Sequence, residues 1–338
     1  MSESSTLTPP PSPGKTTVGA GQSMNPLRRL LRAREAGIFL VVVVIMVILS
    51  IASPNFATAS NLAIVARIIA LNSIIAMGMT LVILLGGIDL SVGSVVALTS
   101  VVVGFVLVKL GMPIWVTILA GLALGALVGF FNGLLIIRTG VAPFIITLGM
   151  MGLARGLALV ITKGSTISGL PEAYLALGQG YWGLVPYPVI IMLVLAVVIH
   201  IMLSRTTFGR RIYFIGSNED AAILSGINVN RIKVIVFALC STLAATEAVI
   251  ETARMSTAQP ASGVGYELTA IGAVIIGGAS MSGGEGTILG TILGATLLGL
   301  ITNGLILLGV SAYWQQVFSG AIIILAVALD TWRRRRSG

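Results

Sequence analysis

The chain of 338 residues is 56% hydrophobic and only 9% charged, and its mean hydropathy is +1.05. Ordinary soluble domains carry about 25% charged residues, so this composition excludes a soluble globular protein and indicates a polytopic membrane protein. The formal net charge is +9. We expect it to reflect basic residues kept on the cytoplasmic side and attracted to anionic lipid, with no nucleic-acid partner.

The two ends of the chain differ from the apolar remainder. Residues 1–34 begin with a stretch rich in Pro, Ser, Thr and Gly that predicts a disordered cytoplasmic tail, and residues 333–338 form a basic cytoplasmic tail. Gly14-Lys15-Thr16 looks like the end of a phosphate-binding loop but lacks the upstream glycine, so we expect no nucleotide site there. Residues 38–52 are interpreted as a retained first span, with a cleaved signal peptide as the alternative.

Apolar segments predict about ten membrane spans with loose boundaries. They are Ala36–Ser53, Leu62–Leu85, Val92–Val108, Pro113–Ile137, Pro143–Thr162, Pro188–Leu203, Val234–Ile250, Leu268–Ala279, Thr287–Leu308 and Trp314–Leu329. Leu268–Ala279 is shorter than the ~20 residues that a straight span needs, which indicates a broken or re-entrant segment.

The distribution of basic residues favours an even number of spans, with both termini in the cytoplasm. Most of the 20 lysines and arginines then lie on the cytoplasmic side, as the positive-inside rule requires. These residues are Lys15, Arg28, Arg29, Arg32, Arg34, Arg138, Arg205, Arg210, Arg211, Arg231, Lys233 and Arg333 to Arg336.

Two glycine stripes at four-residue spacing indicate an internal repeat. The first consists of Gly121, Gly125, Gly129 and Gly133, and the second of Gly286, Gly290 and Gly294. They lie in the fourth and ninth predicted spans, and because this offset is odd, the two halves are predicted to be inverted in the membrane. Inverted halves form a transport pathway at their interface, although the glycines themselves are equally typical of close helix packing. The predicted fold class is therefore an all-α membrane protein with two inverted repeats and some broken or re-entrant segments.

A polar loop, residues 204–233, separates two apolar blocks and predicts a short helix. Either Ser217 or Asn218 can cap it, Glu219 and Asp220 lie in its first turn, and Gly226 can end it. The helix also contains Ala221, Ala222 and Leu224. We expect its apolar side to contact a protein partner, and the alternative is an ordinary connecting loop.

A few polar residues inside the spans are candidates for the pathway. Asp89 follows a double glycine and either lines the pathway or caps the next segment together with Ser91. Arg155 within the fifth span is costly unless it faces a cavity or a partner. Asn132 and Asn303 either bind solute hydroxyls or hold helices together.

An unusual charged group ends the seventh span, where Glu247, Glu251 and Arg254 follow one another at helical spacing. Arg254 is placed to neutralise Glu251 at i+3. We expect either an acidic patch at the outer rim, which would dock a binding protein, or simply a hydrated helix end.

Several motifs together resemble the ribose-type permeases of bacterial ATP-binding-cassette sugar importers. The motifs are Gly86 to Gly93, Thr207-Phe208-Gly209-Arg210, Asn218 to Ala222 with Ser225-Gly226-Ile227, Ala258-Gln259-Pro260, Gly265 to Leu268 and Gly277 to Gly284. The resemblance covers Asn61 to Asp330. The family carries small apolar residues where this chain has Glu247 and Glu251.

The resemblance implies a fold and a set of partners. Residues 35–332 would be a transmembrane permease domain in the bacterial inner membrane, paired with an identical or different second permease subunit. The helix at 218–226 would be the coupling helix for ATPase subunits, which bind ATP and Mg, and this chain would hold no cofactor. An extracytoplasmic binding protein would deliver a monosaccharide such as ribose.

Other classes of function fit the residues less well. An ion-coupled secondary transporter of a small polar solute commonly needs a buried ion site, and Asp89 is the single plausible carboxylate for one. An enzyme needs a constellation of titratable or metal-ligating residues, which this sequence does not offer.

Overall fold

The structure is a computed structural model that describes residues 34–311, together with 313–315, 317–318, 320–321, 324–325 and residue 328. The predicted tails, at residues 1–33 and 333–338, lie outside the described residues. The tenth predicted span, Trp314–Leu329, is described only in part.

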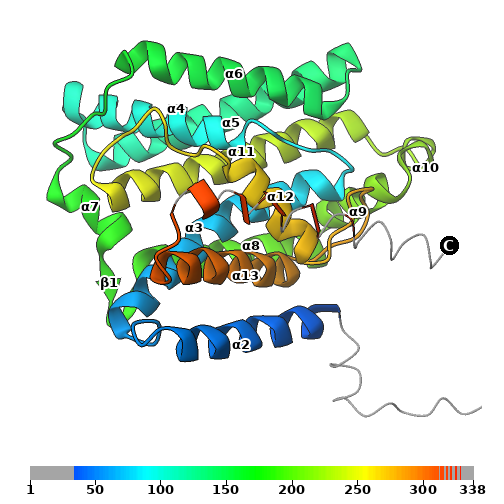
Figure 1. Cartoon of the computed structure of the whole chain (residues 1–338). Helices are drawn as coiled ribbons and strands as arrows, with labels where there is room; N and C mark the ends of the chain where they lie inside the picture. Colours follow the sequence, from blue (N-terminus) through cyan, green and yellow to red (C-terminus); the bar gives the residue numbers. More distant parts are fainter. Residues whose placement is uncertain are drawn as a thin grey trace, which may run out of the picture. The chain divides into compact units, whose positions relative to one another are not determined.

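The described residues fold almost entirely into helices (Figure 1). In chain order the elements are α2 (Arg34–Ala52), α3 (Ala59–Leu84), α4 (Val92–Gly104), the π-helix η1 (Phe105–Lys109), α5 (Ile114–Thr139), α6 (Pro143–Thr162), α7 (Glu172–Gln179), β1 (Tyr181–Trp182), β2 (Val185–Pro186), α8 (Tyr187–Arg205), α9 (Thr207–Ser217), α10 (Glu219–Leu224), α11 (Val229–Met255), α12 (Tyr266–Ile276) and α13 (Ile288–Leu307). The two strands pair as one antiparallel hairpin. The predicted all-α class is confirmed.

The lengths of the helices match the spans that the sequence predicts. Within the described part of the chain, eight helices are long and apolar enough to cross a membrane, with η1 extending α4 in the third of them. Helix α12 has only 11 residues, too few for the ~20 that a straight span needs. The predicted short segment is therefore confirmed as a half-length helix, preceded by a non-helical stretch, residues 256–265.

Local signals set several of the helix ends. The Thr58 hydroxyl accepts the backbone N–H of Asn61 at 3.3 Å and begins α3, and the Asn228 side chain accepts the N–H of Arg231 at 3.0 Å and begins α11. Gly140 ends α5 with φ +67°, a left-handed conformation that suits glycine.

Helix α11 is largely buried and packs against α3, α4 and α5 (Figure 1). The first glycine stripe forms the α5 side of this packing. A Cβ atom on Gly125 would lie 2.5 Å from the Ala245 Cβ, and one on Gly129 would meet the backbone oxygen of Phe237. The interpretation of this stripe as a helix-packing surface is thus confirmed.

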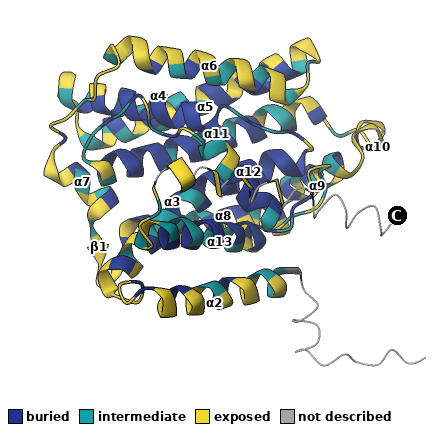
Figure 2. Ribbon diagram, in the orientation of Figure 1, coloured by how far each residue is buried: buried dark blue, intermediate teal, exposed yellow. Residues whose placement is uncertain are grey.

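The outer helices present apolar side chains away from the bundle. Figure 2 shows mostly exposed residues along α2 and α6, and buried residues along α3, α11 and α12. On α6 the exposed residues include Leu153 and Val160. An exposed apolar face of this extent on a spanning helix is a surface for lipid or for another spanning helix.

The bundle has two distinct ends (Figure 1). Helices α9 and α10 lie at one end, which we call the α10 end, and α7 with the β1–β2 hairpin lies at the other, which we call the α7 end. Helix α5 runs from the α7 end to the α10 end, whereas α13 runs in the opposite direction. This is the relation that inverted halves require.

The two ends yield a topological prediction. Ser168, between α6 and α7, and Asn218, at the start of α10, are both exposed. The single native cysteine, Cys240, is buried. We expect new cysteines at Ser168 and Asn218 to react with a membrane-impermeant maleimide from opposite sides of the membrane. Labelling of both positions from the same side of sealed vesicles would contradict the alternation of spans.

Candidate translocation and coupling sites

The first broken connection joins α3 to α4 through residues 85–91. Gly86 adopts φ +76° directly after α3, where a side chain would be strained. Asp89 is fully buried, and its Oδ1 accepts the backbone N–H of Ser91 at 2.8 Å and the Ser91 hydroxyl at 2.6 Å. Ser91 is the N-cap residue of α4 but its side chain makes no cap bond. The predicted joint cap of α4 is therefore not formed, and the Asp89 carboxylate instead fixes Ser91 just before the helix.

Two buried oxygen atoms at this connection accept no hydrogen bond from the described residues. Asn132 on α5 donates from Nδ2 to the Ser91 hydroxyl at 3.0 Å. Its Oδ1 and the Asp89 Oδ2 are buried and have no hydrogen-bond partner among the described residues. Because buried polar groups are nearly always satisfied, this cluster of Asp89, Ser91 and Asn132 has the unused acceptors that a hydroxyl-bearing solute needs.

The second broken connection, residues 256–265, is held by Arg155 of α6. One guanidinium nitrogen, Nη1, donates to the carbonyl oxygens of Pro260 at 2.8 Å and Ser262 at 2.6 Å. The other, Nη2, donates to the carbonyl oxygen of Gly93 on α4 at 3.3 Å. The partner expected for Arg155 is thus the backbone of two other segments, and Arg155 positions the connection against α4.

The two broken connections meet inside the bundle at the point where the first one continues into α4. Gly93 and Gly263 approach so closely that a Cβ atom on either would strike the backbone oxygen of the other. Gly263 has φ +72°, which also favours glycine. Non-helical backbone at such depth is tolerated in membranes only where it is buried in protein or lines a pathway.

Asn303 lies elsewhere and holds two helices together. Its Nδ2 donates to the Asn61 Oδ1 at 2.9 Å, and the Asn61 Nδ2 donates back to the Asn303 Oδ1 at 3.2 Å. This reciprocal pair joins α13 to α3, so the structure supports the interhelical role of Asn303. It does not bring Asn303 into contact with Asp89 or Arg155.

The charged group on α11 differs from the expectation. Glu247 is 0% exposed and Glu251 is 5% exposed, so the prediction of an acidic patch on the outer rim is wrong, as is that of a hydrated helix end. The predicted neutralisation of Glu251 by Arg254 is confirmed.

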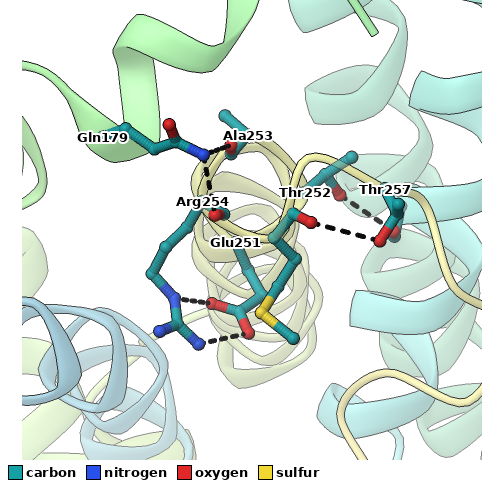
Figure 3. Close-up of polar contacts among 8 residues, drawn as sticks. Gln179, Glu251, Thr252, Ala253, Arg254 and Thr257 are labelled. Carbon is teal, nitrogen blue, oxygen red and sulfur yellow. Dashed lines mark hydrogen bonds and ion pairs between the residues drawn. The ribbon is translucent and has the colours of Figure 1, made fainter. Parts of the chain in front are cut away.

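Figure 3 shows how this ion pair is built into the end of α11. The Arg254 Nε and Nη2 donate to the two oxygens of Glu251 at 2.7 and 2.9 Å. Gln179, from the end of α7, donates to the carbonyl oxygens of Ala253 and Arg254 at 3.4 and 3.1 Å. Gln179 of α7 therefore satisfies carbonyl groups at the C-terminal end of α11, next to the ion pair between Arg254 and Glu251.

The short helix in the polar loop is confirmed as α10. The side chain of Asn218, not that of Ser217, caps it by accepting the backbone N–H of Ala221 at 2.9 Å. Gly226 follows the helix with φ +76°, as predicted.

Helix α10 buries one side and exposes another. Ala222 is buried, whereas Leu224 is 89% exposed and Ile223 is 54% exposed. Glu219 forms an ion pair with Lys233 at 2.7 Å, so one acidic residue of the first turn is already bound within the chain. The exposed apolar pair gives α10 the free surface expected for a partner.

Sequence reasoning missed the amphipathic helix α9, which connects α10 to the end of α3, where the first broken connection begins, and to residues 277–287 between α12 and α13. The Gly216 backbone packs against Leu84, at the end of α3, and against Gly284, whose N–H donates to the Leu84 carbonyl at 3.0 Å. The Tyr213 hydroxyl donates to the Gly286 carbonyl at 2.8 Å, and burial raises the pKa of Tyr213 above its usual value. The spacing of Ile212 and Ile215, both buried, was the available signal.

A bundle of eight apolar spanning helices in the described part of the chain, with two broken connections that meet inside it, defines a membrane transport protein. Residues 59–327 match the family described as branched-chain amino acid transport system / permease component. No solved structure matches the chain.

Comparison with individual relatives narrows the class of membrane transport protein. The chain is 45% identical over 299 residues to the ribose import permease protein RbsC of Bacillus subtilis (strain 168), which covers 88% of this chain and 92% of the relative. It is 47% identical over 293 residues to the RbsC protein of Escherichia coli (strain K12), covering 85% and 90%. The D-allose transport system permease protein AlsC of the same strain is 36% identical over 295 residues, covering 87% and 90%.

The chain therefore belongs to this permease family of ATP-binding-cassette importers, and its resemblance to the ribose-type permeases is confirmed. It is a multi-pass inner-membrane protein. It is not itself the catalytic subunit, because ATP hydrolysis in such importers belongs to a separate ATPase. The comparisons give no support to the ion-coupled alternative.

Proposed function

We propose that the chain forms the translocation pathway for a monosaccharide, such as ribose or a related sugar, in an ATP-driven importer. The observation that carries this proposal is the meeting of the two broken connections at Gly93 and Gly263, in a chain whose relatives are named as ribose and allose permeases. Substrate sites of transporters with inverted repeats are typically built from such discontinuous helices.

The unsatisfied cluster beside the first connection is the proposed pathway surface at the α10 end. The open acceptors on Asp89 and Asn132, with the Ser91 hydroxyl between them, can receive hydrogen bonds from sugar hydroxyls. Arg155 acts as a positioning residue, because its donors are bound to backbone carbonyls rather than left open.

The proposed partners occupy the two ends of the bundle. ATPase subunits that bind ATP and Mg would dock on the cytoplasmic α10 end, over Ile223 and Leu224, with both termini on the same side. A sugar-binding protein would dock on the extracytoplasmic α7 end. A second permease subunit, identical or different, would cover part of the exposed apolar surface.

The coupling route follows from contacts within the chain. Movement of α10 would be transmitted through α9, because Gly216 touches the end of α3 and Gly284, and Tyr213 holds Gly286. The end of α3 and residues 277–287 between α12 and α13 would then move as one rigid body, which is the type of motion expected for domain rocking.

Uptake into proteoliposomes tests the proposed function. The permease, its ATPase and its binding protein would be reconstituted with the binding protein outside and ATP inside, and uptake of radiolabelled D-ribose would be measured with and without a proton and sodium ionophore. We expect uptake that needs ATP and survives the ionophore. Uptake that continues without ATP and stops with the ionophore would contradict the proposal and restore the ion-coupled alternative.

A further inference from the structure

Glu247 on α11 is a buried carboxylate without a hydrogen-bond partner among the described residues. The residue is 0% exposed, and both of its carboxylate oxygens lack a hydrogen-bond partner among the described residues. Burying a carboxylate without a partner costs several kcal/mol, so such groups are normally paired or hydrogen-bonded. An unsatisfied one therefore indicates a function that offsets the loss of stability.

The obvious intrachain partner is already engaged. The guanidinium of Arg254 is bound by both oxygens of Glu251, at 2.7 and 2.9 Å (Figure 3). The charged groups that act most strongly on Glu247 are Glu251 and Arg254. Because these two largely neutralise each other, Glu247 remains as the uncompensated acceptor of the cluster.

The position of Glu247 is that of a pathway residue. Tyr266, the first residue of α12, interacts electrostatically with both Glu247 and Glu251. Helix α12 is the short helix that follows the second broken connection, so this cluster borders the same connection that meets α4 at Gly93. Asp89 and its open oxygen belong to the other connection, which gives each half of the molecule one buried carboxylate with an unsatisfied atom.

We propose that Glu247 is a solute-binding residue, whose carboxylate accepts hydrogen bonds from hydroxyl groups of the transported sugar as it passes the second broken connection. This inference rests on the proposed function and deepens it by adding a second binding position. Adjacent hydroxyls of a sugar can donate to the carboxyl oxygens of Glu247, which lack a partner among the described residues. In the closed bundle the carboxylate is left without these bonds.

The test combines transport with stability, because a structural role and a binding role predict opposite results. Glu247→Met has a side chain of similar length without any acceptor, and Glu247→Gln keeps one acceptor oxygen. In the reconstituted system we expect Glu247→Met to lower D-ribose uptake at least tenfold and Glu247→Gln to lower it less. The unfolding temperature of the purified permease should stay equal or rise in Glu247→Met, because a buried polar group without hydrogen-bond partners is replaced by an apolar side chain.

Asn303→Leu provides the matched control. It removes a buried polar side chain that is fully paired with Asn61, so its unfolding temperature should fall. The inference is overturned if Glu247→Met transports within twofold of the wild type. It is also overturned if the loss of uptake in Glu247→Met comes with a fall in unfolding temperature like that of Asn303→Leu.

Sugar analogues separate hydroxyl binding from proton or cation binding. Uptake of each monodeoxyribose would be compared between the wild type and Glu247→Met. For at least one analogue the difference in uptake between the two proteins should be clearly smaller than for D-ribose, because one of the hydroxyls that bind Glu247 is absent. An equal tenfold loss for every analogue would overturn hydroxyl binding in favour of a proton or cation site. Failure of the wild type to take up D-ribose or D-allose would instead overturn the proposed function, and this inference with it.

Discussion

Replacing Gly129 by leucine is expected to prevent helices α5 and α11 from packing together. A Cβ atom at this position would strike the backbone oxygen of Phe237 and lie 2.7 Å from the Cα of Ala238. Real Cβ atoms do not approach backbone so closely, so α5 would have to move away from α11, a largely buried helix of the bundle. Overpacking of this kind costs about 3 kcal/mol or more, because no flexible side chain can yield.

The measurement is thermal unfolding of the permease purified in a mild detergent. Gly152→Leu on α6 is the matched control, since nothing lies within 4 Å of its added Cβ, and it should stay within about 0.5 kcal/mol of the wild type. Similar unfolding temperatures for the two variants would show that the contact between α5 and α11 does not hold the bundle together.

The spans could be predicted from the sequence because hydropathy is a local property. Each apolar run reports its own environment, and in lipid only a helix satisfies the backbone of an isolated run. The half-length helix α12 could be predicted for the same reason, because its apolar run is short. The cap and the end of α10 were also local, set by Asn218 and Gly226.

The side-chain partners could not be predicted because they depend on tertiary packing. The partner of Asn303 is Asn61, 242 positions away in the chain, and no local pattern distinguishes a solute-binding asparagine from one that is paired with another helix. Arg155 was identified as a buried charge, but its backbone acceptors at Pro260 and Ser262 depend on a connection whose path the sequence does not specify.

The prediction for Glu247 and Glu251 was wrong because it placed two buried residues on the surface. Charge near the end of a span is usually hydrated, and that expectation placed both carboxylates on the surface. Helix α11 extends to Met255, and its end is closed by Gln179 from α7, so both carboxylates lie inside. The error arose because the depth of a residue depends on what covers the end of its helix.

Gly216→Val is expected to abolish coupled uptake while leaving the spans inserted. A Cβ atom on Gly216 would strike the Leu84 carbonyl and lie 2.6 Å from the backbone nitrogen of Gly284. The Gly284 N–H donates to that same carbonyl, so the added side chain would separate α9 from the bond that joins the two halves. We expect ATP-driven D-ribose uptake to fall at least tenfold at normal permease levels.

The decisive comparison is between partner binding and transport. The exposed residues Ile223 and Leu224 on α10 are left unchanged by Gly216→Val, so the ATPase should still be retained in a pull-down. Gly149→Val, on α6 with nothing within 4 Å, controls for insertion and should transport normally. Wild-type uptake by Gly216→Val would remove α9 from the coupling route. Loss of both ATPase binding and uptake would instead mean that α9 shapes the docking surface. Only retained ATPase binding with failed transport locates the defect between α10 and the segments that α9 contacts, which are the end of α3 and residues 277–287.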